Sequence, residues 1–201
     1  MTKEELKRRL FNACDSVKAA EGELTEIDAK FGDADHGYTM TKIMNTVEKS
    51  LKESDGSIKE MLDDTAMAVM VLNGGSAVPL WNTWLDGWQE GAPDSDEMSL
   101  DEIKAMFGTA FETIDDFSGA KVGDKTMMDA LIPASEAIAA YSGDSEDGLF
   151  KAAAEAAVAG AENSRNFKSK FGRAKSYGDQ TIGVPDAGAV SMSRFFVGLA
   201  K

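Results

Sequence analysis

The chain has 201 residues, of which 43% are hydrophobic and 28% are charged, a balance that is typical of globular proteins and excludes wholesale disorder. Its 21 Lys and Arg residues face 35 Asp and Glu residues, and the formal net charge of −14 argues against binding to nucleic acid. The single cysteine, Cys14, rules out an intramolecular disulfide, and neither a signal-peptide pattern nor a long apolar run occurs. We therefore expect a cytoplasmic protein that does not cross a membrane.

The spacing of apolar residues predicts helices along the whole chain. The first begins at a capping-box pair, Thr2 and Glu5. Further helices are expected near residues 23–30, 39–51, 58–72, 76–91, 99–114, 124–141 and 145–167, with a last one that includes 191–199. Pro133 should kink its helix or remove one backbone hydrogen bond. No segment alternates like a strand, so we predict an all-α fold, a single domain over residues 1–201 with about eight antiparallel amphipathic helices.

Four of the connecting segments carry more chemistry than a turn requires. Their sequences are GDADHG at 32–37, NGGSAVP at 73–79, VGDKTM at 122–127 and GRAKSYGDQTIGVPDAGA at 172–189. In an antiparallel array, loops that are separated by an even number of helices lie at the same end. We therefore expect these loops to share one site at the rim.

Three aspartates in and before the first of these loops form a candidate metal site. In an extended segment Asp33 and Asp35 leave the same side of the backbone, and Asp28 lies within reach on the last turn of the preceding helix. Such carboxylates repel one another unless a cation lies among them, and they could serve one Mg²⁺ ion or bridge two. Taken alone, the motif is more simply an Asp-rich turn that caps a helix, and it lacks the further ligands of an EF-hand Ca²⁺ loop.

The other polar loop residues each have a functional and a plainer interpretation. His36, the only histidine, fits a catalytic role and equally a hydrogen-bond donor to the acidic cluster. Gly37 leaves backbone N–H groups free for an oxyanion, while Gly75 and Ser76 could hold a phosphate or simply end one helix and cap the next. Arg173 could contact phosphate or form a salt bridge in this acidic protein.

Two further patterns favour structure over function. The segment 123–126 lacks the spacing of a Walker A phosphate loop, so P-loop chemistry is not supported. Trp81, Trp84 and Trp88 follow helical spacing, which predicts core packing better than a ligand site.

Taken together and in this order, the segments resemble the nucleotide-binding L subunit of dihydroxyacetone kinase over nearly the whole chain. The segments that carry the resemblance are Asp28 with GDADHG, GGS followed by PL, GDKTMMDALIPA, and GRA followed by TIG and D-x-G-A. The resemblance implies a barrel of eight antiparallel helices that binds ADP or ATP at one end through two Mg²⁺ ions. The metal ligands that it implies are Asp28, Asp33 and Asp35. The nucleotide contacts that it implies are His36, Gly37, Tyr38, Thr39, Gly75, Ser76, Ala77, Gly119, Met127, Arg173, Asp186, Ala187 and Gly188.

The sequence departs from the family pattern in three places. Thr39 stands where the family usually has Asn, and Ala77-Val78 stand where it usually has Ser-Gly. Residues 185–188 read Pro-Asp-Ala-Gly where the family reads Asp-Pro-Gly-Ala. Val78 adds a side chain where backbone was free to approach phosphate, so the departures bear more on the phosphate loop than on the metal site.

The resemblance also implies partners. In the family a K subunit holds the sugar, and a phosphohistidine protein of the phosphotransferase system, the M-type subunit, recharges the ADP on a separate L chain. We therefore expect a kinase subunit that passes a phosphoryl group to dihydroxyacetone or a related small ketose, and a homodimer is also possible. The alternatives are a kinase subunit for another triose or tetrose, a nucleotide-loaded regulatory module without turnover of its own, and a plain helical interaction protein.

Overall fold

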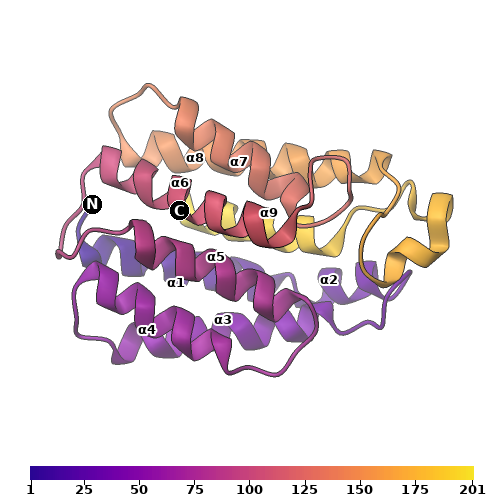
Figure 1. Ribbon diagram of the computed structural model, residues 1–201, viewed down its shortest axis with the longest axis horizontal. Helices are drawn as coiled ribbons and strands as arrows, with labels where there is room; N and C mark the ends of the chain where they lie inside the picture. The colour runs from indigo at the N-terminus through magenta and orange to yellow at the C-terminus, as the bar shows by residue number, and fades with distance from the viewer.

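The computed structural model of the protein describes residues 1–201 and is built of helices (Figure 1). The α-helices are α1 (Lys3–Ala19), α2 (Glu21–Asp28), α3 (His36–Glu53), α4 (Ile58–Met70), α5 (Ala77–Gly91), α6 (Leu100–Ser118), α7 (Met128–Ala140), α8 (Glu146–Asn163) and α9 (Ala187–Leu199). Two 3-10 segments, η1 (Ser164–Asn166) and η2 (Arg173–Thr181), follow α8. There is no β-strand, so the all-α prediction is confirmed, and none of the helices has both the length and the apolar character that a bilayer-spanning segment needs.

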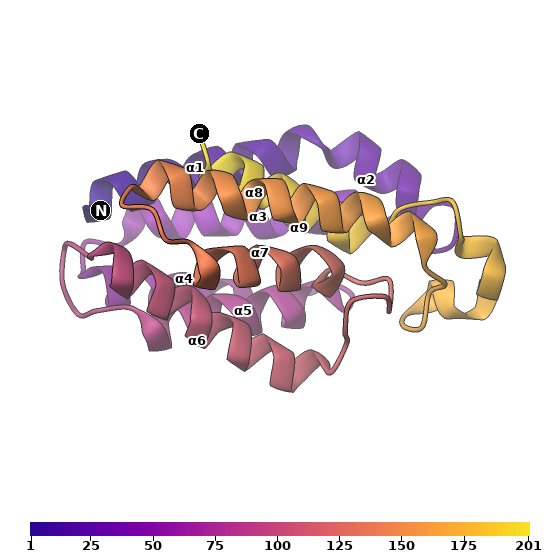
Figure 2. The same ribbon diagram turned by 90° about the horizontal axis from the view of Figure 1, so that it is seen from above.

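The long helices close into a barrel. Neighbours around the ring pack in the order α1, α3, α4, α5, α6, α7, α8, α9 and back to α1, and the short α2 extends the line of α1 (Figures 1 and 2). Successive long helices run in opposite directions, so α1, α4, α6 and α8 begin at one end, the far end, while α3, α5, α7 and α9 begin at the other, the near end. The predicted antiparallel barrel is confirmed.

Aromatic side chains fill the centre of the barrel. Trp81, Trp84 and Trp88 on one face of α5 are at most 1% exposed, and the rings of Trp84 and Trp88 meet edge to face with centroids 4.8 Å apart. Phe107 of α6 lies 4.9 Å from Trp88, and Phe195 of α9 lies 5.2 Å from Trp81. Aromatic pairs of this geometry contribute about 0.5–1.5 kcal/mol each beyond the area that they bury. The predicted core role of the three tryptophans is confirmed.

The contact between the first and last helices closes the ring. At Gly198 of α9 an added Cβ atom would lie 2.3 Å from the Cα atom of Ala13 in α1, so only glycine lets the two backbones approach this closely. The buried guanidinium group of Arg9 in α1 donates to the carbonyl of Leu199 at 2.9 Å, and so satisfies a backbone group at the C-terminus of α9. These contacts hold the two ends of the chain side by side.

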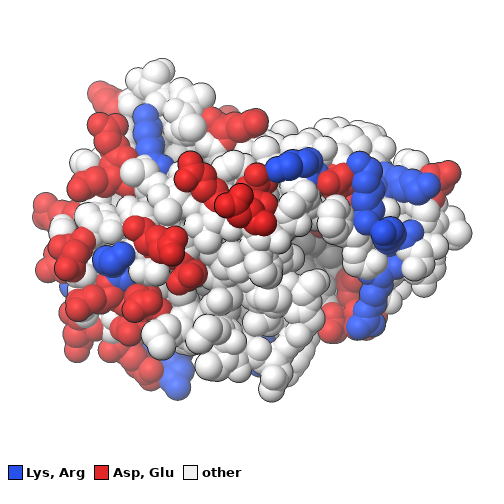
Figure 3. All heavy atoms as spheres, in the orientation of Figure 1, with Lys and Arg blue, Asp and Glu red and all other residues white.

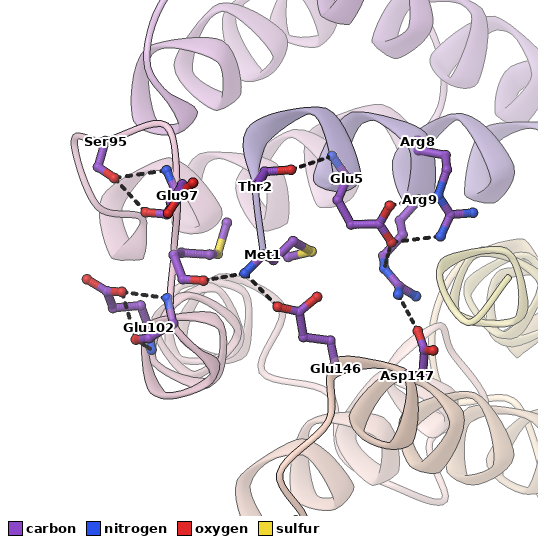
Figure 4. Close-up of polar contacts among 12 residues, drawn as sticks. Met1, Thr2, Glu5, Arg8, Arg9, Ser95, Glu97, Glu102, Glu146 and Asp147 are labelled. Carbon is purple, nitrogen blue, oxygen red and sulfur yellow. Dashed lines mark hydrogen bonds and ion pairs between the residues drawn. The ribbon is translucent and has the colours of Figure 1, made fainter.

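The far end satisfies its own helix N-termini. At each helix that begins there, the hydroxyl of the N-cap residue accepts a hydrogen bond from a backbone N–H of the first turn. These N-cap residues are Thr2, Ser57, Ser99 and Ser145. The predicted pair of Thr2 and Glu5 is only half a capping box, because the carboxylate of Glu5 pairs with Arg8 and Arg9 instead (Figure 4). The α-amino group of Met1 pairs with Glu146 at 2.5 Å at the same end (Figure 4).

Three helix boundaries differ from those predicted. Helix α7 begins at Met128 and not near residue 124, because Gly123 and Lys125 have φ values of 95° and 61° that an α-helix does not allow. Helix α3 begins at His36, three residues before the predicted Thr39, and α8 ends at Asn163 where 3-10 segment η1 takes over. Residues 122–127 are therefore a loop throughout.

Replacement of Gly198 by alanine is expected to destabilise the protein by about 1–3 kcal/mol, because the added methyl group must push α9 away from the backbone of α1. Gly108→Ala is the matched control, since Gly108 is exposed within α6 and an added Cβ atom there meets nothing within 4 Å. That control should gain about 0.5–1 kcal/mol from helix propensity. Urea unfolding measures both free energies, and a Gly198→Ala variant as stable as Gly108→Ala would contradict the close contact.

Candidate functional site

The four unusual loops meet at the near end around a cavity of about 540 Å³. The residues that line it fall within 27–39, 75–81, 118–128 and 169–188. Figure 3 shows a hollow at this end with Lys and Arg side chains along one side of it, while Asp and Glu side chains crowd the far end. The fold thus brings four distant stretches of the sequence to one place.

Asp28, Asp33 and Asp35 converge at the cavity, where one carboxylate oxygen from each lies within 4.8 Å of the others. Asp28 is the last residue of α2, as predicted. The extended conformation predicted between Asp33 and Asp35 is wrong, because Ala34 has a φ of 59° and turns the chain. The backbone N–H of Asp35 donates to Asp28 Oδ2 at 3.1 Å, and this bond folds the loop back onto the end of α2.

This acidic cluster carries more negative charge than its neighbours neutralise. Burial raises the pKa of Asp35, and the charges of Asp33 and Asp28 add to the shift. Arg173 supplies a counter-charge, with its Nη1 atom 2.5 Å from Asp33 Oδ2, but the exposed position of the arginine limits the pair to about 0–1 kcal/mol. Carboxylate oxygens at this spacing fit a divalent cation such as Mg²⁺, which completes its shell with water or phosphate oxygens.

At three helices that begin at the cavity, the side chain of the N-cap residue makes no hydrogen bond to the helix. The first N–H of α7 donates instead to Thr126 Oγ1 at 3.1 Å, and that of α3 donates to Asp28 Oδ2 at 3.4 Å. The N-cap residues of α3, α5 and α7 are Asp35, Ser76 and Met127, and none of them makes the capping hydrogen bond found at every helix start of the far end. Helix α9 also begins at the cavity, with Asp186 as its cap. Each helix N-terminus carries a partial positive charge and backbone N–H groups that bind anions. The near end is therefore built to accept a negatively charged ligand.

His36 joins the start of α3 to the start of α9. Its Nε2 atom lies 3.1 Å from Ser191 Oγ, and that hydroxyl donates to the carbonyl of Gly188 at 2.9 Å. The tautomer of the ring sets the direction of the hydrogen bond between Nε2 and the Ser191 hydroxyl. Burial lowers the pKa of His36, although the charge of Asp28 opposes the shift. The predicted hydrogen bond from His36 to the acidic cluster comes from the backbone N–H, which donates to Asp28 Oδ2 at 3.4 Å, and the catalytic role of the ring stays a prediction.

Two ionisable residues, Asp186 and Lys125, lie on the α9 side of the cavity. Asp186 accepts from the backbone N–H of Ala189 at 2.8 Å, and burial raises the pKa of Asp186 to about 7. Lys125 is 4% exposed, and its ammonium group donates to the carbonyls of Ser164 and Val184. Both charged residues line the cavity. The sequence pattern around Lys125 had indicated only that a Walker A loop is absent, so this residue was missed.

Most of the residues predicted to contact a nucleotide line the cavity, and three do not. Those on the lining are His36, Thr39, Gly75, Ser76, Ala77, Met127, Arg173, Asp186, Ala187 and Gly188. Gly37 does not line the cavity but packs against α2, where an added Cβ atom would lie 2.2 Å from the carbonyl oxygen of Glu21. Tyr38 lies outside the cavity as well, and 67% of it is exposed. Gly119 ends α6 with a φ of 62°, and its two chain neighbours line the cavity in its place.

Apolar lining residues also escaped prediction. Phe31, Leu80 and Phe171 lie on the lining, and Tyr177 of η2 packs against Phe31 with ring centroids 5.3 Å apart. The segment around η2 is thus fastened to the loop of the acidic cluster by an aromatic contact as well as by Arg173. Their position in the sequence could have indicated this role, because Phe31 and Phe171 directly precede the first glycine of two of the four unusual loops.

Residues 30–201 match the DAK2 domain family. The chain belongs to this family. This DAK2 protein is 30% identical to DhaL, the ADP-binding subunit of the PEP-dependent dihydroxyacetone kinase of Escherichia coli, over 89% of the present chain and 87% of DhaL. It is 31% identical to the D-erythrulose kinase of Mycolicibacterium smegmatis over 92% of the present chain, but over only 33% of that kinase. The resemblance to the L subunit is confirmed.

The DAK2 chain also has the fold of the dihydroxyacetone kinase of C. freundii that was solved in complex with AMP-PNP and Mg²⁺. The TM-score is 0.72 at 22% identity, and the match covers 96% of the DAK2 chain and 33% of the other chain. The DAK2 chain therefore spans about a third of the longer kinases and most of the length of DhaL.

Asp186 should make the stability of the DAK2 protein depend on pH. Its folded pKa of about 7 lies above the ordinary value of 3.8, so the folded state holds the proton more tightly and the free energy of unfolding falls as pH rises between these values. Asp186→Asn keeps a capping side chain and removes the titration. The wild-type free energy minus that of the variant should therefore fall between about pH 5 and pH 8, by at most about 1.4 kcal/mol per pH unit.

Asp124→Asn is the control for this measurement by urea unfolding. A hydrogen bond from Lys170 lowers the pKa of Asp124, so this carboxyl is ionised in both states above about pH 5 and its difference from wild type should stay flat. A flat difference for Asp186→Asn as well would show that its pKa is not raised.

Proposed function

We propose that this chain is the nucleotide-binding subunit of a kinase that acts on a small ketose such as dihydroxyacetone. One observation carries the proposal: the cluster of Asp28, Asp33 and Asp35 shares a single cavity with the N-termini of α3 and α5, whose N-cap side chains make no capping hydrogen bond. Carboxylates that hold a cation and helix N-termini that hold an anion are together what a magnesium–nucleotide complex requires. Two relatives, an ADP-binding subunit of a dihydroxyacetone kinase and a D-erythrulose kinase, support the same function.

Each side of the cavity has a separate task in this proposal. Asp28, Asp33 and Asp35 hold one or two Mg²⁺ ions, and bound Mg²⁺ neutralises charge on the phosphates during transfer. Ser76 at the start of α5 offers its hydroxyl and the neighbouring backbone N–H groups to the phosphates, and Arg173 adds a positive charge. Phosphoryl transfer depends on positioning and electrostatics, so these residues suffice without a covalent intermediate on the protein.

The departures from the family pattern are compatible with nucleotide binding. The side chain of Val78 is 4% exposed and lies off the cavity lining, where an added Cβ atom on Gly74 would meet it at 2.5 Å. It therefore does not occupy the space that phosphates need. In the order Pro-Asp-Ala-Gly, Asp186 still caps α9, so the start of that helix is preserved.

The acceptor sugar is proposed to arrive on a partner protein. The near end exposes several large apolar side chains, between 43% and 75% accessible, at Tyr38, Val71, Phe117, Tyr177 and Ile182. Apolar residues gathered on the open face of an acidic protein favour protein docking there. We propose that a K-type subunit presents the ketose at this face and that an M-type phosphohistidine protein recharges ADP there, a cytoplasmic reaction. The words "PEP-dependent" in the name of the E. coli relative support this donor.

Wild-type protein should bind ADP in the presence of Mg²⁺, and the double variant Asp33→Asn/Asp35→Asn should weaken that binding by at least about 100-fold. Loss of hydrogen-bond partners around metal ligands alone costs about 10–100-fold, and loss of the ligands themselves costs more. Asp63→Asn is the matched control, because Asp63 is exposed on α4 outside the cavity. Titration calorimetry measures the dissociation constants. No binding by wild type, or full binding by the double variant, would refute the proposal.

Turnover should require the partners. Purified K-type and M-type proteins with phosphoenolpyruvate and dihydroxyacetone should yield sugar phosphate only when this chain is added, and the Asp33→Asn/Asp35→Asn variant should not support the reaction. Replacing dihydroxyacetone by erythrulose in the same assay tests the sugar. A wild-type chain that binds ADP but restores no turnover with either ketose would favour the regulatory module instead.

A further inference from the structure

Lys125 occupies an unusual place for a lysine. Its side chain is 4% exposed, and its φ of 61° lies in the left-handed region that non-glycine residues rarely adopt. The loop around it is fixed by Asp129, whose two carboxylate oxygens accept from the backbone N–H groups of Gly123 and Thr126, both at 2.7 Å. The backbone is therefore held in a conformation that takes Lys125 into the interior.

The ammonium group of Lys125 joins two segments that are remote in sequence. It donates to the carbonyl of Ser164, directly after α8, at 2.7 Å, and to the carbonyl of Val184, shortly before α9. Burial lowers the pKa of Lys125, while the charges of Asp186 and Asp129 favour its protonated form. Two of the three N–H donors are thus committed to main-chain carbonyls.

Both segments lead into the wall of the cavity. The hydroxyl of Ser164 accepts from the backbone N–H of Asp186 at 2.9 Å, and Asp186 in turn caps α9. Gly188 lies against the start of α7, where an added Cβ atom would be 3.2 Å from the backbone nitrogen of Met127. Met127, Asp186 and Gly188 all line the cavity. Lys125 therefore ties together the starts of the two helices that form this wall.

We propose that Lys125 is a positioning residue for the nucleotide: it sets the spacing between the starts of α7 and α9 and does not itself hold the phosphates. This inference rests on the nucleotide site proposed above. Two of its three donors are used by Ser164 and Val184, so its effect on a ligand passes through the wall that these carbonyls anchor. A displacement of about 1 Å in such a wall is enough to weaken a well-fitted ligand strongly.

Lys125→Met keeps the length of the side chain and removes its charge and donors. The dissociation constant for ADP with Mg²⁺ should rise by about tenfold or more, because two charge-assisted hydrogen bonds behind the wall are lost. Binding of Mg²⁺ alone should change by less than about twofold, since Lys125 has no hydrogen bond to the acidic cluster. Lys125→Arg keeps the charge and the donors and should recover most of the ADP affinity.

Two further variants separate positioning from general stability. Lys170→Met is the matched control, because Lys170 ties the same loop from outside through Asp124 at 2.6 Å and is 61% exposed; ADP binding should stay within about twofold of wild type. Ser164→Ala removes the acceptor of the Asp186 N–H. Its effect on ADP binding should be non-additive with that of Lys125→Met, since both act through the start of α9.

Titration calorimetry measures the dissociation constant for ADP in every variant. Wild-type ADP affinity in Lys125→Met, equal losses of Mg²⁺ and ADP affinity, or additive effects in the double variant would overturn the inference. Should Lys125→Met not fold, unchanged ADP affinity in Ser164→Ala would overturn it, and weakened affinity there would support it. Absence of ADP binding by wild type would defeat the proposed function and this inference together, whereas intact binding by all variants would defeat the inference alone.

Discussion

The alternating direction of the eight long helices determines which polar groups each end of the barrel must satisfy. A closed ring of eight antiparallel long helices must gather four N-termini at each end. The far end satisfies its four with hydroxyl caps, whereas at three of the four at the near end the N-cap side chain makes no such bond. Because hydrogen-bonding groups left without partners are costly, the near end gains from an anionic ligand and the far end does not.

The acidic cluster and the helix N-termini beside it carry opposite charges, and each is unfavourable in the free protein. Asp28, Asp33 and Asp35 repel one another, and the helix N-termini beside them carry the opposite partial charge. Neither set reaches its lowest energy in the free protein, since both are only partly satisfied by local contacts such as that of Arg173 with Asp33. A ligand that contains both a divalent cation and phosphates relieves both sets at once. Interactions that would otherwise add to the free energy of unfolding at this end remain available to bind such a ligand.

The sequence predicted the features that follow from local pattern. Apolar spacing of three and four predicted nearly every helix, and the parity of the loops predicted that they meet at one end. The prediction failed where conformation depends on single backbone angles: Ala34 turns the chain between two aspartates, and Lys125 adopts a left-handed angle that delays the start of α7. Neither residue type signals a positive φ, so the start of α7 was predicted too early and the loop between Asp33 and Asp35 was expected to be extended.

Contacts between distant segments were the other limit. The ring of His36 shares a hydrogen bond with Ser191, which lies 155 residues later in the chain. The close carbonyl of Glu21, and not a ligand, explains why residue 37 is glycine. The residues next to His36 and Gly37 in the sequence do not indicate such partners. The acidic cluster was easier to recognise because Asp28, Asp33 and Asp35 lie within eight residues of one another and together could hold a cation.

The neighbouring positions of α1 and α9 determine how this barrel can be linked to other domains. Met1 pairs with Glu146 and Arg8 reaches the carbonyl of Lys201, so both chain ends lie at the far end, about 28 Å of helix away from the cavity mouth. A domain tethered at either end cannot reach the mouth through a short linker; it must fold back along the barrel or meet the mouth of another molecule. An independent subunit has no such tether and can approach the open end directly.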